Sequence, residues 1–119
     1  MDQDPIFSLE EALARLDDDR ETFQMIVKLF VEQGPKELAE ARAALDSRNA
    51  VDLARSSHRL KGAILLFCAP AVLQACKDLE AAAIGGNLQD AGELYAILER
   101  ELLRLLSALR LVHSRGIPA

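Results

Sequence analysis

Apolar residues recur every three or four positions along most of the chain, which is the period of an α-helix. The pattern is most regular around residues 50–67. There the residues that share one side of a helical wheel, drawn at about 100° per residue, are Leu53, Ser57, Leu60, Ile64 and Phe67. This side should face a hydrophobic core. His58 lies roughly 140° from the centre of that stripe, so we expect it to face water.

The first part of the chain predicts a short helix. It should begin after Ser8, which forms a capping-box pattern with Glu11. The acidic run at residues 17–19 should end this helix and cap the next one, with Glu21 three residues after Asp18. The apolar side chains that the short helix should bury are Leu9, Leu13 and Leu16.

A long helix should follow, from about residue 19 to residue 47. Gly34-Pro35 interrupts it, and proline normally ends or kinks a helix. The apolar phase nevertheless continues across this pair, from Phe30 to Leu38. We therefore expect one long kinked helix rather than two independent helices.

Two turns should separate the remaining helices. Asn49 is a good cap for the His58 helix, and Pro70 suits the first turn of the helix after it. That next helix should end at Gly85-Gly86.

The last helix should be capped by Asn87, with residues 113–119 as a fraying tail. Its leucines cover more than one stripe. The surplus side chains should either pack within the chain, which we favour, or form a dimer face. The leucines outside the stripe are Leu103, Leu106 and Leu111.

Together these elements predict an all-α fold, an up-down antiparallel four-helix bundle with a short additional N-terminal helix. We expect one domain over residues 1–119, with residues 1–7 as a lead-in, because this length suffices for one compact core. The net charge of −5 disfavours nucleic-acid binding, and no apolar run approaches the roughly 20 residues that span a bilayer. The start of the chain lacks the basic residues of a secretion signal, so a cytoplasmic protein is expected.

The neighbours of His58 on the wheel provide a cation and an open space. Lys61 and Gly62 follow it by three and four residues, and Ala54 and Leu65 complete this face as an apolar rim where a partner would dock. A neutral imidazole nitrogen is a nucleophile that can form a covalent intermediate. Lys61 would attract the oxygens of an incoming phosphoryl group, and Gly62 would leave room for the partner. Glycine costs about 1 kcal/mol relative to alanine inside a helix, so its presence requires such a reason.

Other kinds of site are missing from the sequence. We find no nucleotide-binding loop, no Ser/His/Asp arrangement and no metal-ligand spacing. Cys68 and Cys76 form no CxxC pair and should be packing residues. We therefore expect His58 to relay a phosphoryl group that a partner delivers.

The residues around His58 resemble the signature of histidine-containing phosphotransfer (HPt) domains, and the resemblance covers most of the chain. It rests on His58-Arg59-Leu60-Lys61-Gly62, on Leu73, Cys76, Leu79 and Glu80 further along, and on residues 29–35 of the preceding helix. The chain departs from the family at Cys68, where glycine is common, and at Leu65, where small residues are usual. We interpret these two positions as marks of partner choice.

The resemblance implies that the phospho-aspartate of a receiver domain passes its phosphoryl group to His58, which passes it to another receiver. Lys61 and Gly62 would support the reaction, and Gln33 matches a polar position on the neighbouring helix that can hydrogen-bond the imidazole. The expected partners are response-regulator receiver domains and a hybrid sensor histidine kinase. The Mg²⁺ would belong to the receiver, so the chain would need no cofactor of its own. The expected partner contacts are Ala54, Leu65 and Phe30.

Two functions of different classes fit this sequence. The first, which we favour, is a phosphorelay carrier that is phosphorylated on His58 and is not itself an enzyme. The second is a non-catalytic helical module that binds receiver domains or a histidine kinase. The presence of His58 favours the carrier. A four-helix enzyme or metal protein is disfavoured because the ligand motifs are missing.

Overall fold

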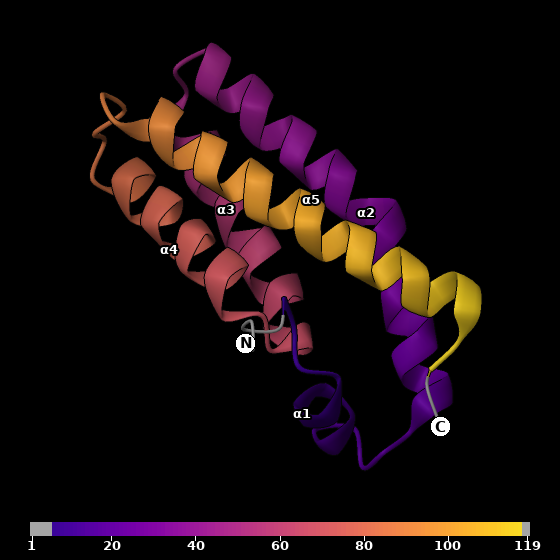
Figure 1. The fold of residues 1–119 in the computed structure, drawn as a ribbon. Helices are drawn as coiled ribbons and strands as arrows, with labels where there is room; N and C mark the ends of the chain where they lie inside the picture. Colours follow the sequence, from indigo (N-terminus) through magenta and orange to yellow (C-terminus); the bar gives the residue numbers. More distant parts are fainter. Residues whose placement is uncertain (1–5, 118–119) are drawn as a thin grey trace, which may run out of the picture.

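Five α-helices and one short 3₁₀ helix form the fold in a computed structural model that describes residues 6–117. The helices are α1 (Leu9–Ala14), α2 (Arg20–Asp46), α3 (Ala50–Ile64), the 3₁₀ helix η1 (Leu65–Phe67), α4 (Pro70–Ile84) and α5 (Ala91–Arg115). Figure 1 shows the four long helices lying alongside one another, with α1 at one end of the bundle.

The packing of the helices confirms the predicted four-helix bundle with an additional N-terminal helix. Each long helix packs on two others, since α2 and α4 both contact α3 on one side and α5 on the other. The short helix α1 packs against η1 and α2. Among the helices of residues 6–117, none has the combination of length and hydropathy needed to cross a membrane.

The hydrophobic core lies between the four long helices. The predicted inner stripe is confirmed, because its four members on α3 and Phe67 on η1 are all buried. Burying a side chain such as Leu or Phe stabilises a fold by roughly 1.5–3 kcal/mol. The inner face of α3 is therefore held firmly, and its outer face is left free to carry chemistry. The largest buried side chains on the other helices include Phe23, Leu79, Leu98, Leu102, Leu105, Leu106 and Leu109.

Helix α2 continues through Pro35, as the unbroken apolar phase predicts. Figure 1 shows that α2 changes direction along its length. Gly34 is buried there, and a Cβ at this position would lie 3.4 Å from the side chain of Leu106 on α5. Leu106 therefore packs within the chain, whereas Leu103 and Leu111 reach the surface.

The helix caps differ from the predictions at two places. Ser8 caps α1 through its hydroxyl, but its own N–H donates to the carbonyls of Phe67 and Cys68, so the reciprocal half of the capping box is not formed with Glu11. The cap of α2 is Asp19 rather than Asp18, since the Asp19 carboxylate accepts from the Thr22 N–H.

The start of the last helix also corrects the prediction. Asn87 does not cap α5, because its side chain accepts from the Gln89 N–H within the turn and the helix begins at Ala91. The helix then continues to Arg115, into the segment predicted to fray, and the fraying itself stays a prediction. Residues 1–5 of the predicted lead-in and residues 118–119 of the predicted tail lie outside the described residues.

The turn between η1 and α4 forces a strained backbone on Cys68. Its φ of 53° and ψ of 56° lie in the left-handed region, which costs a residue with a Cβ roughly 1–2 kcal/mol. The family that the sequence resembles commonly has glycine here, and glycine adopts this conformation without strain.

Replacing Cys68 with glycine should therefore give a more stable protein than replacing it with alanine. Both variants lose the thiol, but only Cys68→Gly relieves the left-handed strain. We expect its free energy of unfolding, measured by urea denaturation, to exceed that of Cys68→Ala by about 1 kcal/mol. Equal stability of the two variants would contradict a strained turn.

Candidate functional site

His58 lies in the middle of α3 on its outer face. Its side chain is 69% exposed, while Ser57 beside it is fully buried. The imidazole therefore stands on a helix whose opposite face is fixed in the core. This is the position that the helical wheel predicts.

Glu80 of α4 reaches across to both His58 and Lys61. One of its carboxylate oxygens lies 2.9 Å from His58 Nδ1, and the other lies 2.7 Å from Lys61 Nζ. The Glu80 side chain is only 11% exposed. Hydrogen bonds between charged groups are short and strong in such a partly dry setting. Lys61 and Glu80 thus form a fixed polar cluster around the base of the imidazole.

The hydrogen bond to Glu80 determines which nitrogen of His58 is reactive. An ionised carboxylate only accepts hydrogen bonds, so the neutral imidazole donates its proton-bearing Nδ1 to Glu80. Nε2 then keeps its lone pair. Because Nδ1 is turned toward α4, Nε2 is the nitrogen available to a partner.

Lys61 keeps the Glu80 carboxylate ionised. Burial alone raises the pKa of Glu80, but the hydrogen bonds from Lys61 and His58, together with their charge interactions, outweigh it and lower the pKa below its ordinary value. Lys61 itself is largely covered, with 26% of its side chain exposed. Its ammonium group is therefore engaged by Glu80, and a direct contact with phosphoryl oxygens stays a prediction.

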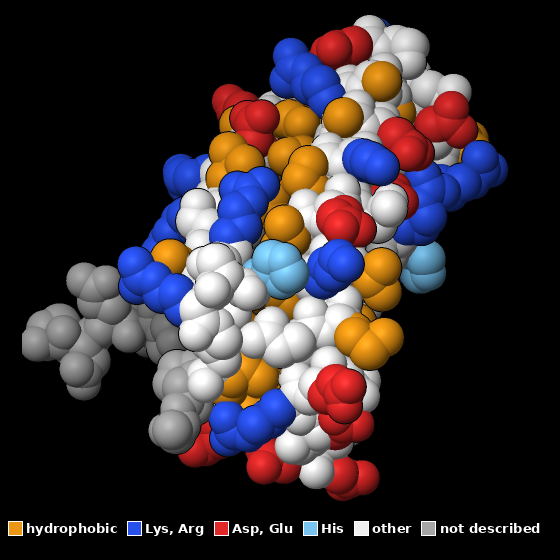
Figure 2. Space-filling model, turned by 90° about the vertical axis from the view of Figure 1, so that its right-hand side faces the viewer, with side chains coloured by type: hydrophobic (Ala, Val, Ile, Leu, Met, Phe, Trp, Pro, Cys, Tyr) orange, Lys and Arg blue, Asp and Glu red, His pale blue; other side chains and the backbone are white. Residues whose placement is uncertain are grey.

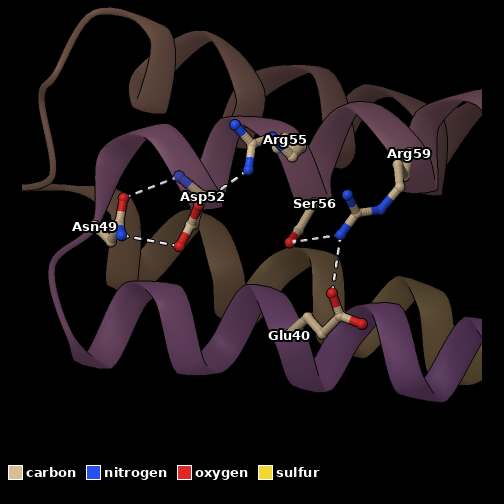
Figure 3. A network of polar contacts seen from close by, with 6 residues as sticks. All are labelled: Glu40, Asn49, Asp52, Arg55, Ser56 and Arg59. Atoms are coloured by element: carbon tan, nitrogen blue, oxygen red, sulfur yellow. Dashed lines mark hydrogen bonds and ion pairs between the residues drawn. The ribbon is translucent and has the colours of Figure 1, made fainter.

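Arg59 ties the other side of α3 to α2. Its guanidinium lies 3.0 Å from Glu37 and 2.9 Å from Glu40. Figure 3 shows Arg59 reaching from α3 to Glu40, with Ser56 beside the contact. The helix that carries His58 is thus fixed by ionic contacts on both flanks.

Gly62 leaves an open space beside His58. A Cβ at this position would have no atom within 4 Å, so packing inside the protein does not require glycine here. Side chains on a helix lean toward its N-terminus, and a side chain at position 62 would therefore lie over position 58, one turn earlier. Gly62 keeps the approach to the imidazole clear.

The other residues predicted for the site lie at varying distances from this centre. Gln33 is exposed and lines an apolar groove of about 180 Å³ between α2 and the end of α3. Within residues 6–117, no hydrogen bond joins Gln33 to His58, whose ring is bonded to Glu80. Ala54 is half-buried, and Leu65 is exposed while its carbonyl accepts from Arg15.

Phe30, an expected partner contact, is largely buried, and its contact with a partner stays a prediction. It is only 5% exposed, and its ring packs 5.0 Å from that of Phe67. Phe30 therefore forms the floor of the groove, while Leu29 and Leu66 are its exposed apolar side chains. Hydrophobic side chains also reach the surface elsewhere, and Figure 2 shows a face on which they lie among charged ones.

Glu80 is the site residue that the motif alone did not assign. One signal was present, because Glu80 falls one turn after Cys76, next to the apolar stripe of α4, where a charged side chain requires a partner. Cys76 itself is a packing residue, as predicted. Its thiol donates to the Ser57 carbonyl, and burial raises its pKa to about 12.

Comparisons with known proteins agree with this geometry. A family model described as the Hpt domain matches residues 25–111, which is more than half of the chain. Among solved structures, the crystal structure of histidine-containing phosphotransfer protein B (HptB) from Pseudomonas aeruginosa PAO1 superposes with a TM-score of 0.86. The match covers 95% of this chain and 98% of that chain at 24% sequence identity, which shows a shared fold. No curated protein matches the chain.

Replacing Glu80 with glutamine should remove part of the pH dependence of stability. The pKa of Glu80 is lowered in the folded state. Its ionised form therefore stabilises the fold above the unfolded-state pKa, and this contribution is lost as the pH falls through the folded-state pKa. Between about pH 5 and pH 3, the wild type should lose more free energy of unfolding than Glu80→Gln does.

Urea denaturation across this pH range measures the effect. The matched control is Glu32→Gln, which neutralises an exposed carboxylate of α2 and should keep the wild-type profile. A profile for Glu80→Gln that is parallel to the wild type would show that the cluster does not hold Glu80 ionised.

Proposed function

The chain belongs to the Hpt domain family, and from this premise we propose that it carries a phosphoryl group on His58 between receiver domains of a two-component phosphorelay. The observation that carries the proposal is the arrangement of the imidazole. Nδ1 is held by Glu80, and the ring stands exposed beside the open space at Gly62. In this proposal the chain is a phosphocarrier, and the receiver supplies the Mg²⁺ and the rest of the reaction site.

The proposed transfer starts from the phospho-aspartate of a receiver, which is an acyl phosphate. The lone pair of His58 Nε2 attacks the phosphorus, and the N–P bond forms as the P–O bond to the aspartate breaks. The aspartate carboxylate leaves with the electron pair of that bond. His58 loses no proton, because its proton stays on Nδ1, and the ring becomes a positively charged phosphoimidazolium.

Glu80 lies where that positive charge develops. Its carboxylate is already in place, 2.9 Å from Nδ1, so no reorganisation is needed during transfer. The onward step reverses the chemistry. The aspartate carboxylate of the next receiver attacks the phosphorus, and neutral imidazole leaves with the electrons of the N–P bond. Glu80 holds the same nitrogen in both directions.

Lys61 and Gly62 take different parts in this proposal. Lys61 is a positioning residue that acts through Glu80, because its ammonium group lies 2.7 Å from that carboxylate. Gly62 admits the loops of the receiver to Nε2. The receiver would rest on the exposed apolar side chains nearby, which are Leu65 and the groove residues Leu29 and Leu66, with Ala54 and Gln33 at the margin.

Incubation with a phosphorylated receiver domain and Mg²⁺ should label the chain with acid-labile, base-stable phosphate. His58→Gln should abolish the label, because it removes the nucleophilic nitrogen. Its helical circular dichroism should be unchanged, since His58 is exposed.

The result separates the candidate functions. A label that persists in His58→Gln would place the phosphoryl group on another residue. If several receivers bind the wild type but none labels it, the chain is a non-catalytic interaction module instead.

Replacing Gly62 with leucine should slow transfer without weakening the fold. A Cβ at this position has no atom of the protein within 4 Å, and a leucine side chain in place of a helical glycine adds up to about 1 kcal/mol of stability. It would, however, occupy the approach to His58, so the rate of labelling should fall by roughly tenfold or more.

The matched control is Gly92→Leu on α5, where a Cβ also has no atom within 4 Å. Labelling rates and thermal unfolding are compared for both variants. Unchanged labelling of Gly62→Leu would show that the partner does not approach over this position.

A further inference from the structure

A phosphoryl group on His58 would bring negative charge that a nearby cation stabilises, and two of the three cationic side chains of α3 are already engaged. Lys61 is bound to the shielded carboxylate of Glu80 at 2.7 Å. Arg59 is bound to Glu37 and Glu40 at 3.0 and 2.9 Å. Moving either one would break an ionic contact that fixes α3 to a neighbouring helix.

Arg55 is held much more loosely. It has one ionic contact, at 3.4 Å from Asp52, and both side chains are more than half exposed, at 63% and 53%. Exposed pairs of this kind contribute little. Asp52 also has a second partner, because its other oxygen accepts from the Asn49 side chain at 2.9 Å. Figure 3 shows this chain of contacts from Asn49 through Asp52 to Arg55. Asp52 therefore stays hydrogen-bonded when Arg55 leaves it.

Arg55 lies one turn before His58 on the surface of α3. It precedes His58 by three residues, so the two side chains are neighbours on the helix surface. Side chains lean toward the N-terminus of a helix, which carries the imidazole over the turn that bears Arg55. Arg55 lines the groove between α2 and α3, on the opposite side of His58 from Glu80. Since Nδ1 is turned toward Glu80, Nε2 lies on the outer part of the imidazole, away from Glu80, where a side chain from the Arg55 side of the helix can reach it.

We propose that Arg55 leaves Asp52 when His58 is phosphorylated and binds the phosphoryl oxygens on Nε2. The inference rests on the proposed function, because it concerns the phosphorylated histidine. No covalent bond changes in this step. The guanidinium exchanges a carboxylate acceptor for phosphoryl oxygens, which match its fork of N–H donors. The phosphorylated site then pairs each charge, with Glu80 against the ring and Arg55 against the phosphoryl group.

This arrangement makes Arg55 a binding residue for the phosphorylated state. Arg55 favours phospho-His58 over free His58, so it shifts the equilibrium of transfer from the receiver toward this chain. The contact is exposed, and its effect should therefore weaken as salt is added.

The test is the equilibrium of phosphoryl transfer between a phosphorylated receiver domain and this chain, in the presence of Mg²⁺. Arg55→Ala should move it back toward the receiver by roughly three- to tenfold. Arg55→Lys should fall between Arg55→Ala and the wild type, because it keeps the charge and loses the fork. Asp52→Asn should move the equilibrium the other way, because it removes the competing carboxylate.

The matched control is Arg100→Ala on α5, which removes an exposed arginine from a helix that packs on α2 and α4 rather than beside His58. It should keep the wild-type equilibrium. In the wild type, the NMR signal of the Arg55 Nε–H should also shift on phosphorylation, and that of Arg100 should not.

Two failures are distinguishable. If Arg55→Ala, Arg100→Ala and the wild type share one equilibrium, Arg55 does not bind the phosphoryl group, while the carrier function stands. If the wild type accepts no phosphoryl group from any receiver, the proposed function fails and this inference fails with it.

Discussion

The chemistry of this surface depends on one shielded carboxylate. A carboxylate removed from water is costly unless it is paired and hydrogen-bonded, and Glu80 meets both conditions through Lys61 and His58. Both contacts join α4 to α3. The contact with His58 also determines which imidazole nitrogen keeps its lone pair. Packing, tautomer and reactivity therefore follow from one ionic cluster, and a change to Glu80 alters all three together.

The packing of α3 fixes the position of this cluster. The inner stripe of α3 is buried among the other helices, Arg59 ties one flank of the helix to α2, and Glu80 ties the other flank to α4. A reactive group on a helix fixed in this way stays within a narrow range of positions, which a loop does not ensure. In the proposed transfer, this chain supplies a nucleophile in a constant place, and the receiver supplies the movement and the metal chemistry.

The sequence could predict those features that depend on the helical period alone. The angular positions of residues around a single helix predict three features. These are the exposure of His58, the buried stripe of α3 and the continuity of α2 through Pro35. The role of Glu80 could not be obtained in this way, because it depends on how α4 is aligned with α3 across 22 residues of sequence. The cap at Asp19 was missed because three consecutive aspartates are equally good caps until the chain path is known.

Several residues that lower local stability lie close to His58 in the sequence or the fold. This clustering distinguishes the site from other positions with an unfavourable conformation. Gly62 lowers helix stability, Glu80 is a shielded acid, and Leu65 leaves an apolar side chain in water. Such exceptions to local rules are expected where function is selected over stability. Cys68 shows that a single exception does not mark a functional site, because its left-handed backbone belongs to the turn between η1 and α4. His58 differs from Cys68, because Gly62 of α3 and Glu80 of α4, each with its own local cost, both lie beside the same imidazole ring.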